Sequence, residues 1–370
     1  MATIYVITIL LNLIYLSYQQ QCVISTYEDV DSVVSSCTDI AIDDLIVPAS
    51  TTLTLNLQEG TTLTLRGNIS FGFDNWSGPL VLITGSSLTV IAAPGAVFDG
   101  QGERYWDGQG IWGSLKPLLL RIEATNSVFS GINILNCPIR CSRIKDSNNV
   151  TISNWNIDNS AGDVDAAQPQ NSAQNTEGIQ VVTSVGISLL DSQVTNQDDC
   201  VAINSGSNVV VSDINCDGSH GLSIGSIGPS GLDADAFDEN SIDNVTIKNS
   251  ALVNGQNGIQ IITYVDAPNG LISNVLYENI TFEGPNTYGI EIQQNYRNVP
   301  PNVTTDPTPV GNVPIVNLTL RNIVGNVAAS AVPVCIKCAD GACLNFDWHN
   351  VTVTGVLPND CNVNPDGYDC

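Results

Sequence analysis

Positively charged residues are scarce in this chain. Lysine and arginine together number 11 of 370 residues, against 37 aspartates and glutamates, and the net charge is −26. A field of that sign repels phosphate backbones and anionic lipids, which argues against nucleic acid and membranes as partners. Between Asp146 and Tyr296 the only lysine or arginine is Lys248. Any anionic ligand of this region would have to be attracted locally, against the overall field.

Long hydrophobic runs are also missing. The one apolar stretch, from about Ile4 to Tyr18, is too short to span a membrane, and no stop-transfer pattern follows it. We therefore expect residues 1–21 to be a cleaved signal peptide and the protein to be secreted to the extracellular space. The usual basic residues before such a run are missing, since the first basic residue is Arg66. An N-terminal anchor or a buried strand is the alternative interpretation.

Cysteine, by contrast, is abundant, with 11 residues, and this indicates an oxidising compartment. Short spacings favour four local disulfides, although connectivity does not follow from sequence alone. Three cysteines then remain, so at least one thiol is free. A zinc site at Cys335-x-x-Cys338 is disfavoured because no second pair or histidine follows at zinc spacing. The four expected pairs are Cys22–Cys37, Cys200–Cys216, Cys338–Cys343 and Cys361–Cys370.

Sequons for N-glycosylation are more frequent than chance predicts, and they indicate a glycosylated surface. They stand at Asn68, Asn75, Asn149, Asn244, Asn279, Asn302, Asn317 and Asn350.

Short apolar segments recur along residues 22–370, and no linker divides them, so we expect one domain. We also expect the protein to be a monomer. One class is a glycine followed by alternating apolar residues, as in 178–181, 258–261 and 289–292. A second class of segment, in which apolar residues alternate with a polar one, follows the glycine segments, as in 187–189 and 245–247. No segment of this length can bury its own apolar face, so stacking of neighbouring coils is needed to make a core.

The sequence therefore predicts an all-β protein, a parallel β-helix with one coil per repeat. A β-sandwich is the alternative, but hairpin signals are few. The segment from Tyr27 to Thr38 has helical spacing and would cover the open N-terminal strand edge of the coil.

The residues that carry chemistry lie in turns beside these segments. Asp198 and Asp199 are adjacent, so both face one groove only at a turn or bulge. His220 comes about one coil later and Glu177 about one coil earlier, and coils stack about 4.8 Å apart. Like charges at that distance raise one another's pKa, which can keep a carboxyl protonated as a general acid. For most Asp-Asp pairs in loops, solvation or local capping is the alternative explanation.

The motifs together resemble the polygalacturonases of glycoside hydrolase family 28, closest to the fungal endo-acting type. The resemblance covers nearly the whole mature chain. It is carried by the segments 95–102, 106–108, 116–117, 159–163, 196–200, 220–226 and 288–290. It implies a secreted right-handed parallel β-helix that hydrolyses α-1,4-galacturonan, the homogalacturonan of plant cell-wall pectin, with inversion of configuration.

The resemblance also implies roles for single residues. Asp198 matches the general acid, and Asp199 matches one of two carboxylates that activate the attacking water. His220 matches the histidine that tunes the acid. Asn175 and Gln197 belong to the matching substrate-binding segments, and Tyr288 matches a tyrosine near the catalytic subsite, although a core aromatic is the alternative for it.

Three departures fall on the site itself. Glu177 replaces the second water-activating aspartate, while Gln260 and Ile262 replace the arginine and lysine that grip the galacturonate carboxylate. A hydrogen bond to a charged group contributes roughly 1.5–3 kcal/mol, so losing two costs on the order of 10²–10⁴-fold in rate. We therefore predict a pseudoenzyme, impaired or inactive on polygalacturonate.

Such a protein would bind pectic polysaccharide, or would bind the plant polygalacturonase-inhibiting proteins as a decoy. The alternative is an active inverting hydrolase of galacturonan or of a modified pectin: esterified, rhamnogalacturonan or xylogalacturonan. A structural β-helix without a sugar ligand is a third interpretation. The resemblance implies no cofactor, and we expect no metal, since Asp- and Asn-rich turns are weak evidence for Ca²⁺.

Overall fold

The computed structural model describes residues 21–164, 169–228, 240–299, 303 and 306–370. Residues 1–20 of the predicted signal peptide and the sequon at Asn302 lie outside the described residues. Within them, no helix combines the length and apolarity that a membrane crossing requires.

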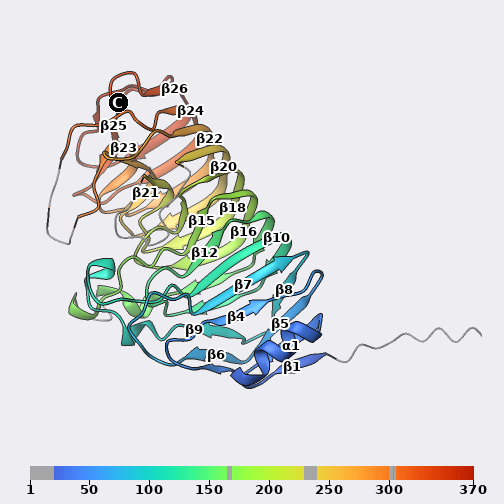
Figure 1. Cartoon of the computed structure of the whole chain (residues 1–370). Helices are drawn as coiled ribbons and strands as arrows, with labels where there is room; N and C mark the ends of the chain where they lie inside the picture. The colour runs from blue at the N-terminus through green and yellow to red at the C-terminus, as the bar shows by residue number, and fades with distance from the viewer. Residues whose placement is uncertain (1–20, 165–168, 229–239, 300–302, 304–305) are drawn as a thin grey trace, which may run out of the picture.

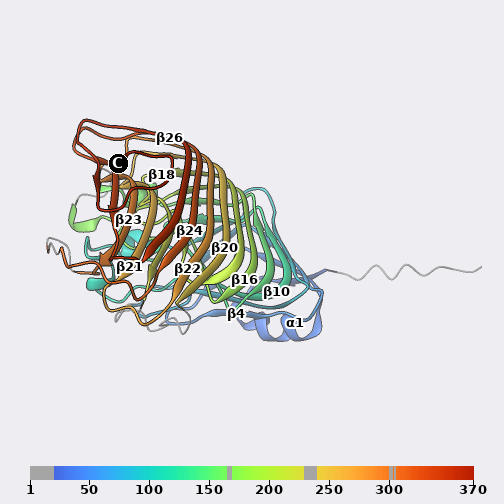
Figure 2. The same cartoon turned by 90° about the horizontal axis from the view of Figure 1, so that it is seen from above.

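The described chain winds into stacked coils whose strands form one long parallel sheet (Figures 1 and 2). Strands at equivalent positions of successive coils pair with one another, and each coil contributes strands to up to three such series. The first series, which we call the groove face, consists of β4 (Leu53–Asn56), β7 (Val81–Ser86), β10 (Leu120–Ser130), β12 (Ser142–Lys145), β15 (Ile179–Val182), β17 (Val201–Ile203), β19 (Leu222–Ile227), β21 (Asn257–Tyr264), β23 (Tyr288–Tyr296), β25 (Val332–Lys337) and β27 (Asp360–Cys361).

The other two series close the coil behind the groove face. The second consists of β1 (Cys22–Ile24), β2 (Asp39–Asp43), β5 (Thr62–Arg66), β8 (Thr89–Ala92), β10, β13 (Asn148–Ser153), β16 (Ser184–Thr195), β18 (Gly206–Asp217), β20 (Ser241–Val253), β22 (Leu271–Glu283), β24 (Ile315–Asn326) and β26 (Cys343–Thr354). The third, which joins β16, consists of β3 (Ile46–Val47), β6 (Asn68–Phe71), β9 (Val97–Asp99), β11 (Asn133–Leu135) and β14 (Asn156–Asp158).

Among the described residues, helical structure is limited to short pieces. The α-helix α1 (Val30–Ser36) follows the 3₁₀ turn η1 (Tyr27–Asp29) and packs on β1 and β4 at the N-terminal end of the coil, with Val30 and Val34 buried (Figure 1). The predicted parallel β-helix with a capping helix is thus confirmed, and the β-sandwich alternative is wrong. The remaining 3₁₀ turns are η2 (Gly102–Arg104), η3 (Gly110–Trp112), η4 (Ser160–Gly162) and η5 (Pro169–Asn171).

The core is built from apolar side chains at equivalent positions of successive coils. On the groove face the inward side chains pair in register and form one aliphatic stack with no solvent exposure. Burying each such side chain contributes about 1.5–3 kcal/mol. The members of this stack are Ile122, Ile144, Val181, Ile203, Ile224, Ile261, Ile292 and Ile336.

Asparagine occupies the corners where the long strands bend. These residues have positive φ, which asparagine tolerates better than most residues, and their side-chain amides bond from coil to coil. In one corner stack Asn350 donates to Asn322, Asn322 to Asn279 and Asn279 to Asn249, each at 3.0 Å. Sequon asparagines at 149, 244, 279, 317 and 350 all donate in such corner bonds. Their glycosylation, and that of exposed Asn68 and Asn75, stays a prediction.

The structure contains five disulfides. Four are the local pairs named from sequence, and the fifth joins Cys137 to Cys141. Cys335 is left as a buried free thiol. Because Cys338 is bonded to Cys343, it is not a zinc ligand together with Cys335.

Replacing Ile203 by alanine is expected to lower the free energy of unfolding by about 2–5 kcal/mol, since the cavity lies between two rigid neighbouring coils. Guanidinium denaturation measures this. The matched control is Val324→Ala on the outside of the coil, where the side chain is 55% exposed and the cost is below about 1 kcal/mol. Equal effects of the two changes would contradict the proposed core.

Candidate active site

The floor of the site is the outward counterpart of the aliphatic stack. Because strand side chains alternate, the residue before each inward aliphatic one points out of the coil, and these residues again pair in register. We call them the outward row. It consists of Arg143, Gln180, Ala202, Ser223, Gln260, Glu291 and Cys335.

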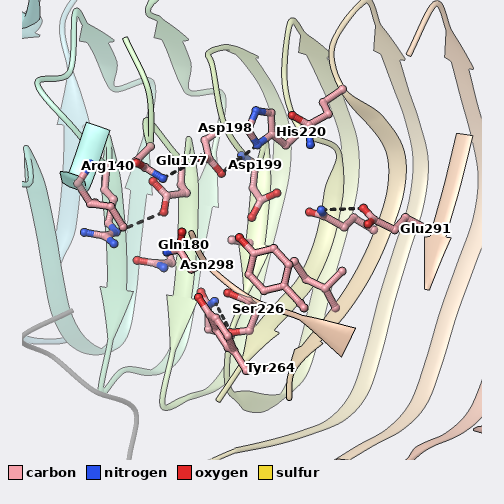
Figure 3. A pocket seen from close by; sticks show the side chains of 18 residues that line it. Arg140, Glu177, Gln180, Asp198, Asp199, His220, Ser226, Tyr264, Glu291 and Asn298 are labelled. Carbon is pink, nitrogen blue, oxygen red and sulfur yellow. Dashed lines mark hydrogen bonds and ion pairs between the residues drawn. The ribbon is translucent and has the colours of Figure 1, made fainter. Parts of the chain in front are cut away.

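The two aspartates lie at the turn between β16 and β17, as their adjacency requires. Asn196 fixes this turn, because its buried side-chain amide donates to the carbonyls of Asp198 at 3.0 Å and Asp199 at 2.9 Å. The same amide donates to the carbonyl of Thr176 one coil earlier at 2.8 Å. Both carboxyls therefore face one cavity (Figure 3).

Asp198 is surrounded by hydrogen-bond donors. The backbone N–H of Asp199 donates to its Oδ1 at 2.7 Å, and the Asn175 amide donates to its Oδ2 at 3.2 Å. His220 Nδ1 lies 3.5 Å from Oδ1. Burial raises the pKa of Asp198, but His220, the Asp199 N–H and Arg140 outweigh burial and lower it below its usual value. Asp198 is therefore the ionised carboxylate of the pair.

Asp199 has the opposite environment. It is buried, its Oδ1 lies 2.6 Å from the hydroxyl oxygen of Ser223, and the Asp198 charge is adjacent. Burial, and then Asp198, raise the pKa of Asp199 well above its usual value. The two neighbouring carboxyls thus differ in protonation, which is the arrangement that acid–base chemistry uses.

Glu177 forms one side of the cavity with Arg140. Arg140 Nε lies 3.3 Å from Glu177 Oε1, and both side chains are largely buried (Figure 3). Burial raises the pKa of Glu177, Asp198 adds to this effect and Arg140 opposes it. Arg140 comes from the loop before β12 and is the one lysine or arginine among the described residues that line the cavity.

The opposite side is a hydrogen-bonded wall of Gln260 and Glu291 (Figure 3). Gln260 Nε2 donates to Glu291 Oε2 at 2.9 Å, and Asn257 Nδ2 donates to the same oxygen at 3.0 Å. Burial raises the pKa of Glu291 to about 7. Ile262 adds an apolar side chain to this wall and has no donor to offer.

The cavity between these walls measures about 230 Å³. A second hollow of about 440 Å³ adjoins it, shares Asn175, Asp198 and His220, and is bordered by Trp112 and Val164. Together they make one groove in which Asp198 lines both hollows and Asp199 lines the first.

Most residues predicted from sequence meet in this groove. The first cavity takes in Asp198, Asp199, His220, Glu177, Asn175, Gln260 and Ile262, and Gln197 borders the second. Tyr288 is half-buried at the start of β23 and is not among the described residues lining either hollow. Its assignment to the catalytic subsite stays a prediction that the geometry does not support.

Sequence reasoning missed Arg140, Gln180, Tyr264, Glu291, Tyr296 and Asn298, which also line the cavity. A signal for Glu291 exists, because Gly289-Ile290-Glu291 repeats the pattern Gly258-Ile259-Gln260 one coil later. Arg140 lies in an irregular loop, where no pattern points to it.

Asp198, Asp199 and His220 are also the group of described side chains close enough to share a metal ion, with ligand atoms within 4.8 Å of one another. The chemistry does not suit a metal. Asp198 raises the pKa of His220 to about 9, against the effect of burial, so the imidazole is protonated at neutral pH and has no lone pair for an ion. Ion pairing with Asp198 accounts for this geometry.

Comparison with known proteins decides the family. The profile for glycosyl hydrolases family 28 matches residues 37–368. The chain belongs to this family. It is 40% identical over 355 residues to a polygalacturonase of Phaedon cochleariae, which covers 94% of this chain and 93% of that protein. It is 37% identical over 353 residues to endopolygalacturonase I of Aspergillus niger, with 94% and 91% covered.

Solved structures agree with this assignment. Endopolygalacturonase I from Stereum purpureum, complexed with two galacturonates, superimposes with a TM-score of 0.81 at 28% identity and covers 92% of this chain and 96% of that one. The family 28 resemblance drawn from the sequence is confirmed. As a family 28 protein, the chain has relatives that are pectin-degrading hydrolases.

The His220–Asp198 pair predicts a pH dependence of stability. The pKa of His220 is raised from 6.5 to about 9 in the folded protein, so its stabilisation is complete below pH 6.5 and is lost as the pH rises through about 9. Denaturation of the wild type and of His220→Gln should therefore differ most below pH 6.5. The difference should shrink above pH 9, and a constant difference would contradict the ion pair.

Proposed function

We propose that this protein is a secreted polygalacturonase-like protein of pectin (homogalacturonan) metabolism that binds pectic polysaccharide and is impaired in, or incapable of, hydrolysing polygalacturonate. The family supports the pectic substrate, and the cysteine content and N-terminal sequence support secretion. Binding of an inhibitor protein and the monomeric state stay predictions.

The wall facing Asp199 carries this proposal. Where the family resemblance implies two cations, the wall offers Gln260, Ile262 and Glu291. The amide of Gln260 already donates to Glu291, and Ile262 cannot donate. Since the pKa of Glu291 is about 7, this carboxyl carries partial negative charge at neutral pH and repels a galacturonate carboxylate. Losing two charge-assisted hydrogen bonds removes on the order of 10²–10⁴-fold in rate.

Glu177 adds to the impairment. One of its carboxyl oxygens faces Arg140 Nε at 3.3 Å, so this ion pair competes with any contact between the carboxyl and a water beside Asp199. Its side chain is also longer than the aspartate of the family by about 1.3 Å, and a misplacement of about 1 Å can cost ~10²-fold.

An active hydrolase of a modified pectin is the second candidate. One observation favours it: Asp198, Asp199 and His220 remain together in one cavity, with the two carboxyl pKa values shifted in opposite directions. A wall without cations suits an esterified or neutral sugar, as in esterified pectin, rhamnogalacturonan or xylogalacturonan.

Reducing-end release from demethylated polygalacturonate tests the first candidate. We expect the purified, signal-free protein to release no more than the Asp198→Asn variant, because the substrate carboxylate finds no cation at the wall. Release clearly above that variant would refute impairment. Release only from esterified or branched pectins, abolished by Asp198→Asn, would establish the second candidate instead.

Restoring the family residues is the complementary experiment. The triple variant Glu177→Asp, Gln260→Arg, Ile262→Lys should raise kcat/KM on polygalacturonate by at least ~10-fold over the wild type, since each restored charged contact contributes roughly 1.5–3 kcal/mol. Ile262→Met is the matched size control for the lysine and should leave the rate unchanged. No gain in a folded triple variant would place the cause of the impairment elsewhere.

A further inference from the structure

We propose that Glu291 is a positioning residue that turns the Gln260 amide so that its carbonyl faces Ser223, and that this arrangement holds a proton on Asp199. The inference deepens the proposed function and rests on it for its functional meaning, because it gives a second physical reason for impaired hydrolysis. Its test below does not depend on any substrate.

The orientation of Gln260 follows from Glu291. Glu291 Oε2 already accepts an N–H from Asn257 at 3.0 Å, and it accepts a second from Gln260 at 2.9 Å. A carboxyl oxygen that receives two N–H donors is an acceptor whether Oε1 is protonated or not. The nitrogen of Gln260 therefore faces Glu291, and its carbonyl oxygen faces the other way, 3.0 Å from Ser223 Oγ.

Ser223 then lies between two oxygen atoms. Its hydroxyl is 2.6 Å from Asp199 Oδ1 and 3.0 Å from Gln260 Oε1, and the side chain has no solvent exposure. One hydroxyl proton cannot serve two acceptors. If Asp199 were ionised, one of these two oxygens would have no side-chain donor among the described residues. A protonated Asp199 completes the chain, because it donates to Ser223 and Ser223 donates to Gln260.

The charged groups around Asp199 also bear on whether it is protonated. Asp198 and Glu177 disfavour a second negative charge there, while His220 and a hydrogen bond from Ser223 would favour one. Tyr277 and Tyr296 approach from the other sides as neutral phenols, since burial raises the pKa of both. Around Glu291 the facing groups are His220, Tyr288, Tyr296 and Cys335.

The resting proton distribution is thus the reverse of the one that the family roles require. Asp198, which matches the general acid, is ionised, while Asp199, which matches a water-activating base, carries the proton. An arginine at position 260 has donors only and would not accept from Ser223, so Gln260 is the change that creates this chain of hydrogen bonds.

The test is a titration of Asp199 by ¹³C NMR in the full-length mature protein, with the Asp199 signal assigned from its loss in Asp199→Asn. In the wild type we expect a midpoint well above that of an ordinary aspartate. Glu291→Val frees the Gln260 amide to rotate and should lower the midpoint. Glu291→Gln removes the same charge but keeps a carbonyl acceptor, so it should leave the midpoint high.

The direction of the midpoint shift in Ser223→Ala is an independent test. If Ser223 accepts the Asp199 proton, removing the hydroxyl destabilises the neutral acid and lowers the midpoint. A rise in Ser223→Ala would show that the hydroxyl donates to an ionised Asp199, and it would overturn the proposal. Equal midpoints for Glu291→Val and Glu291→Gln would also overturn it. A failed hydrolysis prediction with these midpoints intact would refute only the proposed function.

Discussion

Register between successive parallel coils is the constraint on which the rest of this structure depends. Side chains alternate along each strand of the groove face, so the same pairing that stacks Ile203 on Ile224 inside the coil stacks Ala202 on Ser223 outside it. The register of the aliphatic stack therefore also fixes the register of the outward row. A catalytic groove on such a surface needs no domain interface, because neighbouring coils deliver its side chains side by side.

Charge is distributed unevenly along this groove. Arg140, the one arginine among the described residues that line it, is paired with Glu177, while the opposite wall carries the carboxyl of Glu291. Between them the aspartate pair is divided by local hydrogen bonding: Asp198 receives donors from three directions, and Asp199 meets a single hydroxyl. This arrangement favours a protonated Asp199 beside an ionised Asp198.

The sequence alone predicted the coil, its capping helix and the meeting of Glu177, Asp198 and His220, because short apolar repeats and turn motifs carry that information locally. It did not predict Arg140 or Glu291. Coil length varies along the chain, so spacing in sequence does not say which residues of distant coils share one rung. Tyr288, which matches a motif near the catalytic subsite, is not among the described residues lining either hollow, and its role stays a prediction.

The stacked architecture has a mechanical consequence. The strands of each coil pair only with strands of the coils before and after it, so the sheet behaves as a one-dimensional array whose cooperativity passes between nearest neighbours. Fraying of such an array starts at its two ends, here under α1 and beyond β27. The groove occupies coils from the middle of the array, so partial melting would shorten the rod while the aspartate pair and its walls stay assembled.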